Sequence, residues 1–299
     1  MKITLTGSIG HIGKPLTKEL IKKGHSVTVI SSTTERAKEI ETIGGKPLIG
    51  SVLNVDFLIS AFKGADAVYC MVPPANYFDQ SLDLPKYYSD LGNNYAAAIK
   101  KTEIKKVVNL SSIGAHLEKG NGILSGTYQV EKSLNELPQN VDITHIRPTE
   151  FYYNLLPQVH SVKANGFMAS NIGADVVNAW VSPIDIASAV ANELVSKSQG
   201  RKVRYVASEE ITYNKLVSIL GKAIGKPELH WVTITNGQMK SSLVSVGMQP
   251  ECAEGLIEMY SAVNSGLLYE HYNLHKPKSM GKIKVEDFAK DFDQAYNKL

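Results

Sequence analysis

The chain has 299 residues, and its 43% hydrophobic and 20% charged residues are typical of a globular protein with a substantial core. Its 32 basic and 29 acidic residues give a net charge of +3, which is too balanced to indicate a nucleic-acid partner. The two cysteines are far apart and no apolar stretch reaches the roughly 18 residues of a membrane-spanning helix, so we expect a cytoplasmic protein without disulfides, a metal site or a membrane partner.

Apolar runs and helical patterns alternate through the first half of the chain. The runs are rich in Val, Ile and Leu without polar alternation, which is typical of parallel strands buried on both faces. Strands are expected at 2–7, 25–31, 46–50, 65–74, 105–114 and 141–148, and helices at 12–24, 34–44, 54–64, 87–102 and 126–136. This alternation predicts an α/β fold of the Rossmann type, a doubly wound parallel sheet that binds its ligand at the carboxyl ends of the strands.

The pattern changes after Pro148. A helix with Pro183 in its first turn is expected at 182–196, followed by a returning strand at 202–208 and an amphipathic helix at 211–226. Short helices are expected between about 228 and 280, and the chain ends in a helical pattern. The predicted NAD(P)-binding domain is 1–155, completed by about 182–208, and the predicted smaller C-terminal substrate lobe is 156–181 with 209–299.

Three glycines follow the first predicted strand at the spacing Gly7-x-x-Gly10-x-x-Gly13. In a strand–turn–helix unit the first glycine permits the tight turn, the second lets the backbone approach a pyrophosphate, and the third lets the helix pack against the sheet. The N–H groups at the start of the helix then bind the phosphates. The triplet therefore predicts a dinucleotide cofactor.

The end of the second strand indicates which dinucleotide. Proteins that bind NAD usually carry Asp or Glu there, to bind the ribose hydroxyls. This chain instead has Ser31, Ser32 and two threonines before Arg36, with His11 nearby in the glycine turn. Hydroxyls and a guanidinium suit a 2′-phosphate, so NADP(H) is preferred and NAD(H) is possible. A solvated Arg36 on the next helix is the alternative.

Several motifs resemble those of the NmrA-like family of atypical short-chain dehydrogenases/reductases. They are "TGSIGHIG" at the N-terminus, "VVNLSSIGA" at the fifth strand, "IRPTEFYYNLL" at 146–156 and "SPIDIASAVANEL" at 182–194. The resemblance covers roughly residues 1–225 and implies a Rossmann fold with a small substrate lobe that binds NADP(H) or NAD(H). The family includes reductases of quinones, dyes and phenolic compounds, and redox sensors that bind the cofactor without turnover. Its usual Gly-Asp after the third strand is Gly50-Ser51 here.

The predicted helix at 126–136 contains a Tyr-x-x-x-Lys pair, Tyr128 and Lys132, followed by Glu136. At 100° per residue these three side chains lie within about 80° of one another, so they share one face of the helix. The apolar stripe of the same helix is Val130, Leu134 and Leu137. The Tyr/Lys face therefore points either to a cleft or to solvent.

Extended short-chain dehydrogenases share the Tyr-x-x-x-Lys-x-x-x-Glu pattern. This resemblance implies that Lys132 binds the ribose and that Tyr128 donates a proton to a carbonyl as hydride arrives. The third catalytic group in those enzymes is a hydroxyl at the end of the fifth strand, where this chain has Ile113, with Ser112 next to it. An exposed pair at a common helical spacing is the alternative.

The remaining site candidates follow the fourth and sixth strands. The expected cofactor contacts are Gly7, Ser8, Gly10, His11, Ile12, Gly13, Ser31, Ser32, Arg36, Met71, Val72, Pro73, Lys132 and Pro148. Phe151, Tyr152 and Asn154 are expected to line the substrate site, with the core of the lobe as the alternative position for the aromatic rings. The predicted function is NADP(H)-dependent hydride transfer to a small quinone, carbonyl or conjugated acceptor. A non-catalytic NADP(H) sensor and a sugar-nucleotide epimerase or dehydratase remain alternatives, and the oligomeric state is open.

Overall fold

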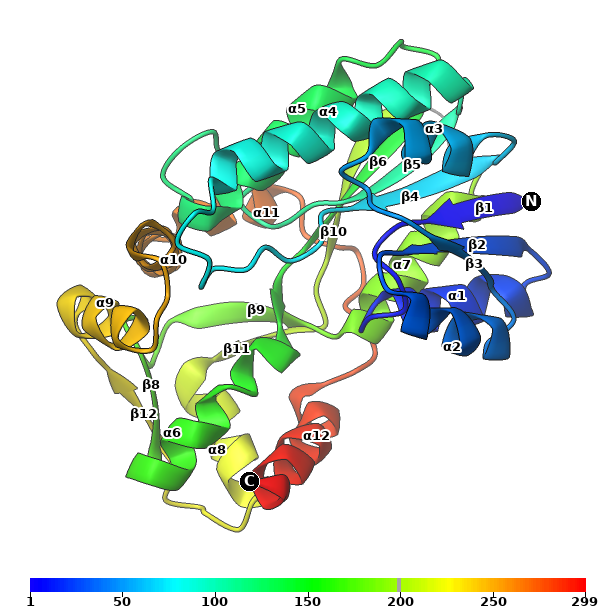
Figure 1. The fold of residues 1–299 in the computed structure, drawn as a ribbon. Coiled ribbons are helices and arrows are strands. Elements are labelled where there is room, and N and C mark those ends of the chain that lie inside the picture. The colour runs from blue at the N-terminus through cyan, green and yellow to red at the C-terminus, as the bar shows by residue number, and fades with distance from the viewer. Residues whose placement is uncertain (198–199) are drawn as a thin grey trace.

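The computed structural model describes residues 1–197 and 200–299, and its centre is a seven-stranded parallel sheet. The strand order is β10-β6-β5-β4-β1-β2-β3, so the chain reverses its winding direction between β1 and β4 (Figure 1). This arrangement confirms the predicted doubly wound Rossmann sheet. The strands are β1 (Lys2–Leu5), β2 (Ser26–Ser31), β3 (Lys46–Ile49), β4 (Ala67–Met71), β5 (Lys106–Leu110), β6 (Asp142–Pro148) and β10 (Arg201–Val206).

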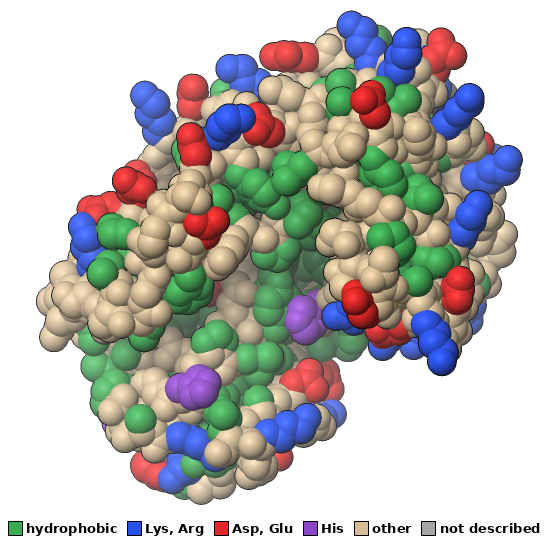
Figure 2. Space-filling view, in the orientation of Figure 1, with side chains coloured by type: hydrophobic (Ala, Val, Ile, Leu, Met, Phe, Trp, Pro, Cys, Tyr) green, Lys and Arg blue, Asp and Glu red, His purple; other side chains and the backbone are tan. Residues whose placement is uncertain are grey.

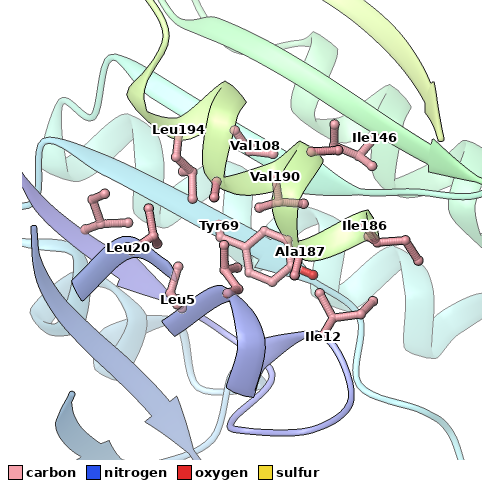
Figure 3. Packing of buried hydrophobic residues seen from close by; sticks show 14 of the residues in the cluster. Leu5, Ile12, Leu20, Tyr69, Val108, Ile146, Ile186, Ala187, Val190 and Leu194 are labelled. Carbon is pink, nitrogen blue, oxygen red and sulfur yellow. The ribbon is translucent and has the colours of Figure 1, made fainter. Parts of the chain in front are cut away.

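Helices α1 (Gly13–Lys22) and α7 (Pro183–Val195) cover one face of the sheet, beside the shorter η1 (Thr34–Arg36) and α2 (Ala37–Thr42). Figure 3 shows Leu20 of α1 and Val190 and Leu194 of α7 pointing toward Tyr69 and Val108 of the strands. These side chains are fully buried, as expected for helices with an apolar stripe at helical spacing.

The other face of the sheet carries α3 (Val55–Phe62), α4 (Leu84–Thr102) and α5 (Ser125–Asn135), with the short 3₁₀ helix η2 (Gly122–Leu124) before α5. The side chains of Asn54 and Asp83 accept hydrogen bonds from backbone N–H groups in the first turns of α3 and α4, which fixes where these helices begin.

A second, smaller unit follows β6. The chain enters it at Glu150, and Tyr152 and Leu155 already belong to its core, although the predicted domain boundary is at 155. Its strands, which the sequence patterns did not predict, are β7 (Glu150–Phe151), β8 (Phe167–Ser170), β9 (Val177–Val181), β11 (Glu209–Thr212) and β12 (His230–Thr233). Its helices are η3 (Tyr152–Leu155), α6 (Gln158–Asn165), α8 (Tyr213–Ala223), α9 (Asn236–Ser245), α10 (Pro250–Asn264), η4 (Leu267–Tyr269), α11 (Glu270–Leu274) and α12 (Val285–Lys298).

The strands of the second unit form two small sheets, β11-β9-β7 and β12-β8. Helices α8 and α12 pack together below them, near the C-terminus in Figure 1. Over the described ranges, no helix has both the length and the apolar character needed to cross a membrane.

Candidate cofactor and active site

The turn between β1 and α1 is shaped by its glycines. Gly7 has φ +87° and Ser8 has φ +58°, a left-handed conformation that reverses the chain tightly. A Cβ on Gly13 would lie 2.0 Å from the carbonyl oxygen of Ser8, so a larger residue could not bring α1 this close to the turn. At Gly10 a Cβ would meet only the carbonyl oxygen of Gly7, 4.0 Å away. The space beside Gly10 is therefore open, as close approach of a pyrophosphate requires.

Unpaired backbone N–H groups line the same turn. Those of His11 and Ile12 donate to no residue that the structure describes, and no side chain caps the start of α1. Free N–H groups at the positive end of a helix dipole are suited to bind phosphate. The residues of the turn thus fit the pyrophosphate of a dinucleotide.

Beside the end of β2, the carboxylate of Glu39 joins two cations, Lys14 of α1 and Arg36 of η1. Glu39 accepts from Lys14 Nζ at 2.9 Å and from Arg36 Nη1 at 3.1 Å. The hydrogen bond from Lys14, followed by that from Arg36, lowers the pKa of Glu39. Ser32 is exposed beside them, whereas the buried Ser31 hydroxyl accepts from the Ser8 hydroxyl at 3.0 Å. Ser31 therefore shapes the turn, and the polar groups exposed at this end are Ser32 and the two cations paired with Glu39.

The chain after β4 is held firmly against the glycine turn. The N–H of Met71 donates to the Thr6 hydroxyl at 2.9 Å, and a Cβ on Gly7 would lie 2.3 Å from the Met71 sulfur. Tyr87 of α4 donates to the carbonyl oxygen of Pro73 at 3.1 Å. Val72 and Pro73 are half-buried, so the segment presents a fixed, mostly apolar edge beside the turn.

The segment after β6 also reaches the glycine turn. The ring of Tyr153 stacks on His11 with centroids 4.6 Å apart, and Phe151 lies 5.2 Å from Tyr153. Pro148 accepts a hydrogen bond from the N–H of Ile113 at 2.9 Å, which joins the ends of β6 and β5. Tyr153 thus places an aromatic ring directly against the turn.

The structure buries the predicted substrate residue Tyr152, in line with the alternative position in the core of the lobe. Its side chain is 1% exposed, lies in the core of the second unit and donates to Glu209. Asn154 is exposed and makes no hydrogen bond to the described part of the chain. The difference arises because η3 turns successive side chains by more than 90°, so neighbouring aromatics enter different environments.

The structure places the predicted site residue Lys132 on the exposed side of its helix. Val130 is buried, and Lys132, two residues later, lies about 200° around α5 and is exposed. Tyr128 is half-buried, and neither it nor Lys132 forms a hydrogen bond or ion pair within the described ranges. Lys132 therefore lies away from the buried stripe of α5, and its role at the ribose stays a prediction.

Glu131, rather than Lys132, is the buried charged residue of α5. Its carboxylate accepts from Arg147 Nε at 2.9 Å, from Arg147 Nη2 at 2.6 Å and from the hydroxyl of Ser111. Both partners of the ion pair are 6% exposed in their side chains. The pair ties α5 to the ends of β5 and β6, and it places no free acid or amine there.

The ion pair continues into a chain of polar and aromatic groups. Arg147 Nη1 donates to the Tyr205 hydroxyl at 3.3 Å, and that hydroxyl contacts His271 Nδ1 at 2.9 Å. His116 stacks on His271 with centroids 5.4 Å apart, and burial lowers the pKa of His116 to about 4. No group of His, Cys, Asp and Glu in the described residues is arranged to hold a metal ion.

A hollow opens on the face shown in Figure 2, between the part built around the large sheet and the second unit, and hydrophobic side chains gather in it. A separate cavity of about 620 Å³ lies where α4, η2 and α10 meet. Its apolar walls include Leu82, Leu84, Tyr88 and Ile123. The molecule therefore offers apolar space for a small organic molecule between α4 and α10.

Comparison with known proteins identifies the family. Residues 7–197 match the model of a family described as NAD(P)H-binding. The chain belongs to this NAD(P)H-binding family. The matched range begins at the glycine turn and ends with α7, so it covers most of the large sheet.

The chain also resembles individual proteins, at low sequence identity. An NAD(P)H azoreductase from Xenophilus azovorans is 23% identical over 261 residues, 87% of this chain and 86% of that protein. The structure is similar to an NADPH-dependent quinone oxidoreductase from Escherichia coli complexed with NADPH, with TM-score 0.79, 19% identity and coverage of 97% and 99% of the two chains. It is also similar to Citrobacter sp. triphenylmethane reductase complexed with NADP(H), with TM-score 0.76, 18% identity and coverage of 97% and 99%.

Proposed function

We propose that this member of the NAD(P)H-binding family is an NADP(H)-dependent oxidoreductase of the NmrA-like type, which passes hydride to a small quinone, carbonyl or conjugated acceptor. The observation that carries the proposal is the open space beside Gly10, flanked by unpaired N–H groups, at the point where the sheet reverses its winding direction. Doubly wound sheets bind dinucleotides at that point. The azoreductase and the two solved reductases support the reaction class.

Each part of the site has a role in this proposal. NADPH would supply the hydride from its nicotinamide ring. The N–H groups of His11 and Ile12 bind the pyrophosphate, and Ser32, Lys14 and Arg36 bind the 2′-phosphate. The predicted apolar contacts Met71, Val72, Pro73 and Pro148 pack against the nicotinamide end and exclude water from it.

Steady-state oxidation of NADPH with a panel of quinones and azo dyes tests the proposal. We expect turnover with several acceptors and a higher kcat/KM for NADPH than for NADH. A flat trace over the whole panel, from protein that binds NADPH, would reject the enzymatic proposal.

A flat trace would favour a redox sensor that binds NADP(H) without turnover. The exposure of Lys132 and its lack of a partner among the described residues support this alternative, because neither observation gives the Tyr/Lys pair a catalytic role. The same observation removes the support that Tyr128 and Lys132 gave to an epimerase.

A further inference from the structure

Glu150 lies where the predicted nicotinamide end meets the second unit. It follows Pro148, the last residue of β6, by two residues, so their Cα atoms are within about 8 Å of each other. Successive side chains of a strand point to opposite faces. Phe151 packs against the core of the large sheet, and Glu150 accordingly points into the second unit.

Only one oxygen of the Glu150 carboxyl is engaged by the protein. Oε2 accepts from Asn178 Nδ2 at 2.7 Å and from the Tyr213 hydroxyl at 3.0 Å. Oε1 accepts no hydrogen bond from the described residues. It is nevertheless not one of the solvent-inaccessible side-chain atoms that lack a hydrogen-bond partner. Oε1 is therefore not fully sealed from solvent, while Oε2 holds the group in place.

Phenols surround this carboxyl from three elements. Burial raises the pKa of Tyr213 from α8, of Tyr260 from α10 and of Tyr269 from η4, and the nearby Glu150 carboxylate adds to the rise of each. Tyr77, which lies in the connection between β4 and α4, is close enough to Tyr260 to raise its pKa further. The carboxyl thus lies on the side of the second unit that faces the chain leaving β4.

Among the residues that the structure describes, Glu150 has no cation as a partner. Burial raises its pKa to about 7, and the hydrogen bonds from Tyr213 and Asn178 only partly oppose this rise. The coupled phenols are uncharged near neutral pH, and the neighbouring carboxylate Glu210, which also acts on Tyr269, is paired with Lys276. The group therefore carries a transferable proton at neutral pH, which suits a general acid.

We propose that Glu150 is the proton donor of the reaction and gives the proton on Oε1 to the oxygen or nitrogen of the bound acceptor. The proposal rests on the oxidoreductase function proposed above. NADPH loses a hydride and becomes NADP⁺, and the acceptor gains that hydride and one proton from Glu150. The C=O, N=N or conjugated bond is reduced, and the carboxylate recovers its proton from water through its open side.

The pH profile of the Glu150→Gln variant tests the proposal. Glutamine keeps the size of the side chain and an oxygen that can accept from Asn178 and Tyr213, but it has no transferable proton. With an azo dye as acceptor, the wild-type kcat should fall as the pH rises through about 7. Glu150→Gln should lose this dependence and lower kcat about 10²-fold at acidic pH, as expected when a general acid is removed.

Glu210→Gln is the matched control, because Glu210 is paired with Lys276 and should leave the profile unchanged. A Glu150→Gln variant that binds NADPH normally and keeps the wild-type rate and pH profile would overturn the proposal. If Glu150→Gln fails to fold, Glu150→Asp serves as the second variant. Its kcat should be lower than that of the wild type and should still fall as the pH rises. An unchanged kcat would overturn the proposal. Wild-type protein that binds NADPH but reduces no acceptor would instead reject the proposed function itself.

Discussion

The buried ion pair between Glu131 and Arg147 allows a direct test of how α5 sits on the sheet. In Glu131→Gln the side chain keeps its shape but loses its charge, so the guanidinium of Arg147 remains buried without a counter-charge. Removing one partner of a buried pair costs about 3–5 kcal/mol. Glutamine still has one oxygen that can accept from Arg147 or Ser111, so we expect the lower end, about 3 kcal/mol.

Urea unfolding followed by circular dichroism measures this cost. If m is about 3 kcal/mol per molar, the midpoint should fall by about 1 M. Lys132→Gln is the matched control, since it removes a charge from the next residue on the exposed side of the same helix and should change stability by less than about 0.5 kcal/mol. Equal effects of the two substitutions would refute the orientation of α5 described here.

Three further predictions concern the cofactor and the acid. Lys14→Ala and Arg36→Ala should each weaken NADPH binding about tenfold, measured by fluorescence titration, and leave NADH binding nearly unchanged, because each removes one charge-assisted contact with the 2′-phosphate. Tyr128→Phe should leave kcat/KM for a quinone unchanged, since the proposed proton donor is Glu150; a large loss would restore the phenol as the acid. The pKa of Glu150 is raised in the folded protein, which therefore holds this proton to a higher pH than the unfolded chain does. The stabilisation that the bound proton gives to the folded state is complete below pH 4.5 and is lost as the pH rises through about 7. The loss amounts to about 3 kcal/mol in urea unfolding and should be absent from Glu150→Gln.

The large sheet was predictable because each of its strands has a recognisable local sequence pattern. Each is a run of Val, Ile and Leu bounded by a helix, and the glycine turn marks the first crossover. The strands of the second unit are only two to five residues long and pair across large sequence separations, as Phe167 does with His230. Their pairing depends on tertiary contacts, which local patterns do not contain.

The site was predicted in part. The spacing of Gly7, Gly10 and Gly13 indicated the turn, because each position has a backbone requirement of its own. The Tyr128 and Lys132 spacing matched a motif but could not distinguish a cleft from solvent. Glu131 is adjacent to the apolar stripe, and its burial is explained only by Arg147, which lies on another element.

The central claim is that the glycine turn holds NADPH, and titration of the Gly10→Ala variant with NADPH tests it most directly. The added methyl group meets no described atom closer than 4.0 Å, so thermal unfolding should match that of the wild type. Binding should weaken at least about tenfold, because the methyl group occupies the space that the pyrophosphate needs. Wild-type affinity in a folded Gly10→Ala variant would contradict the proposed cofactor site.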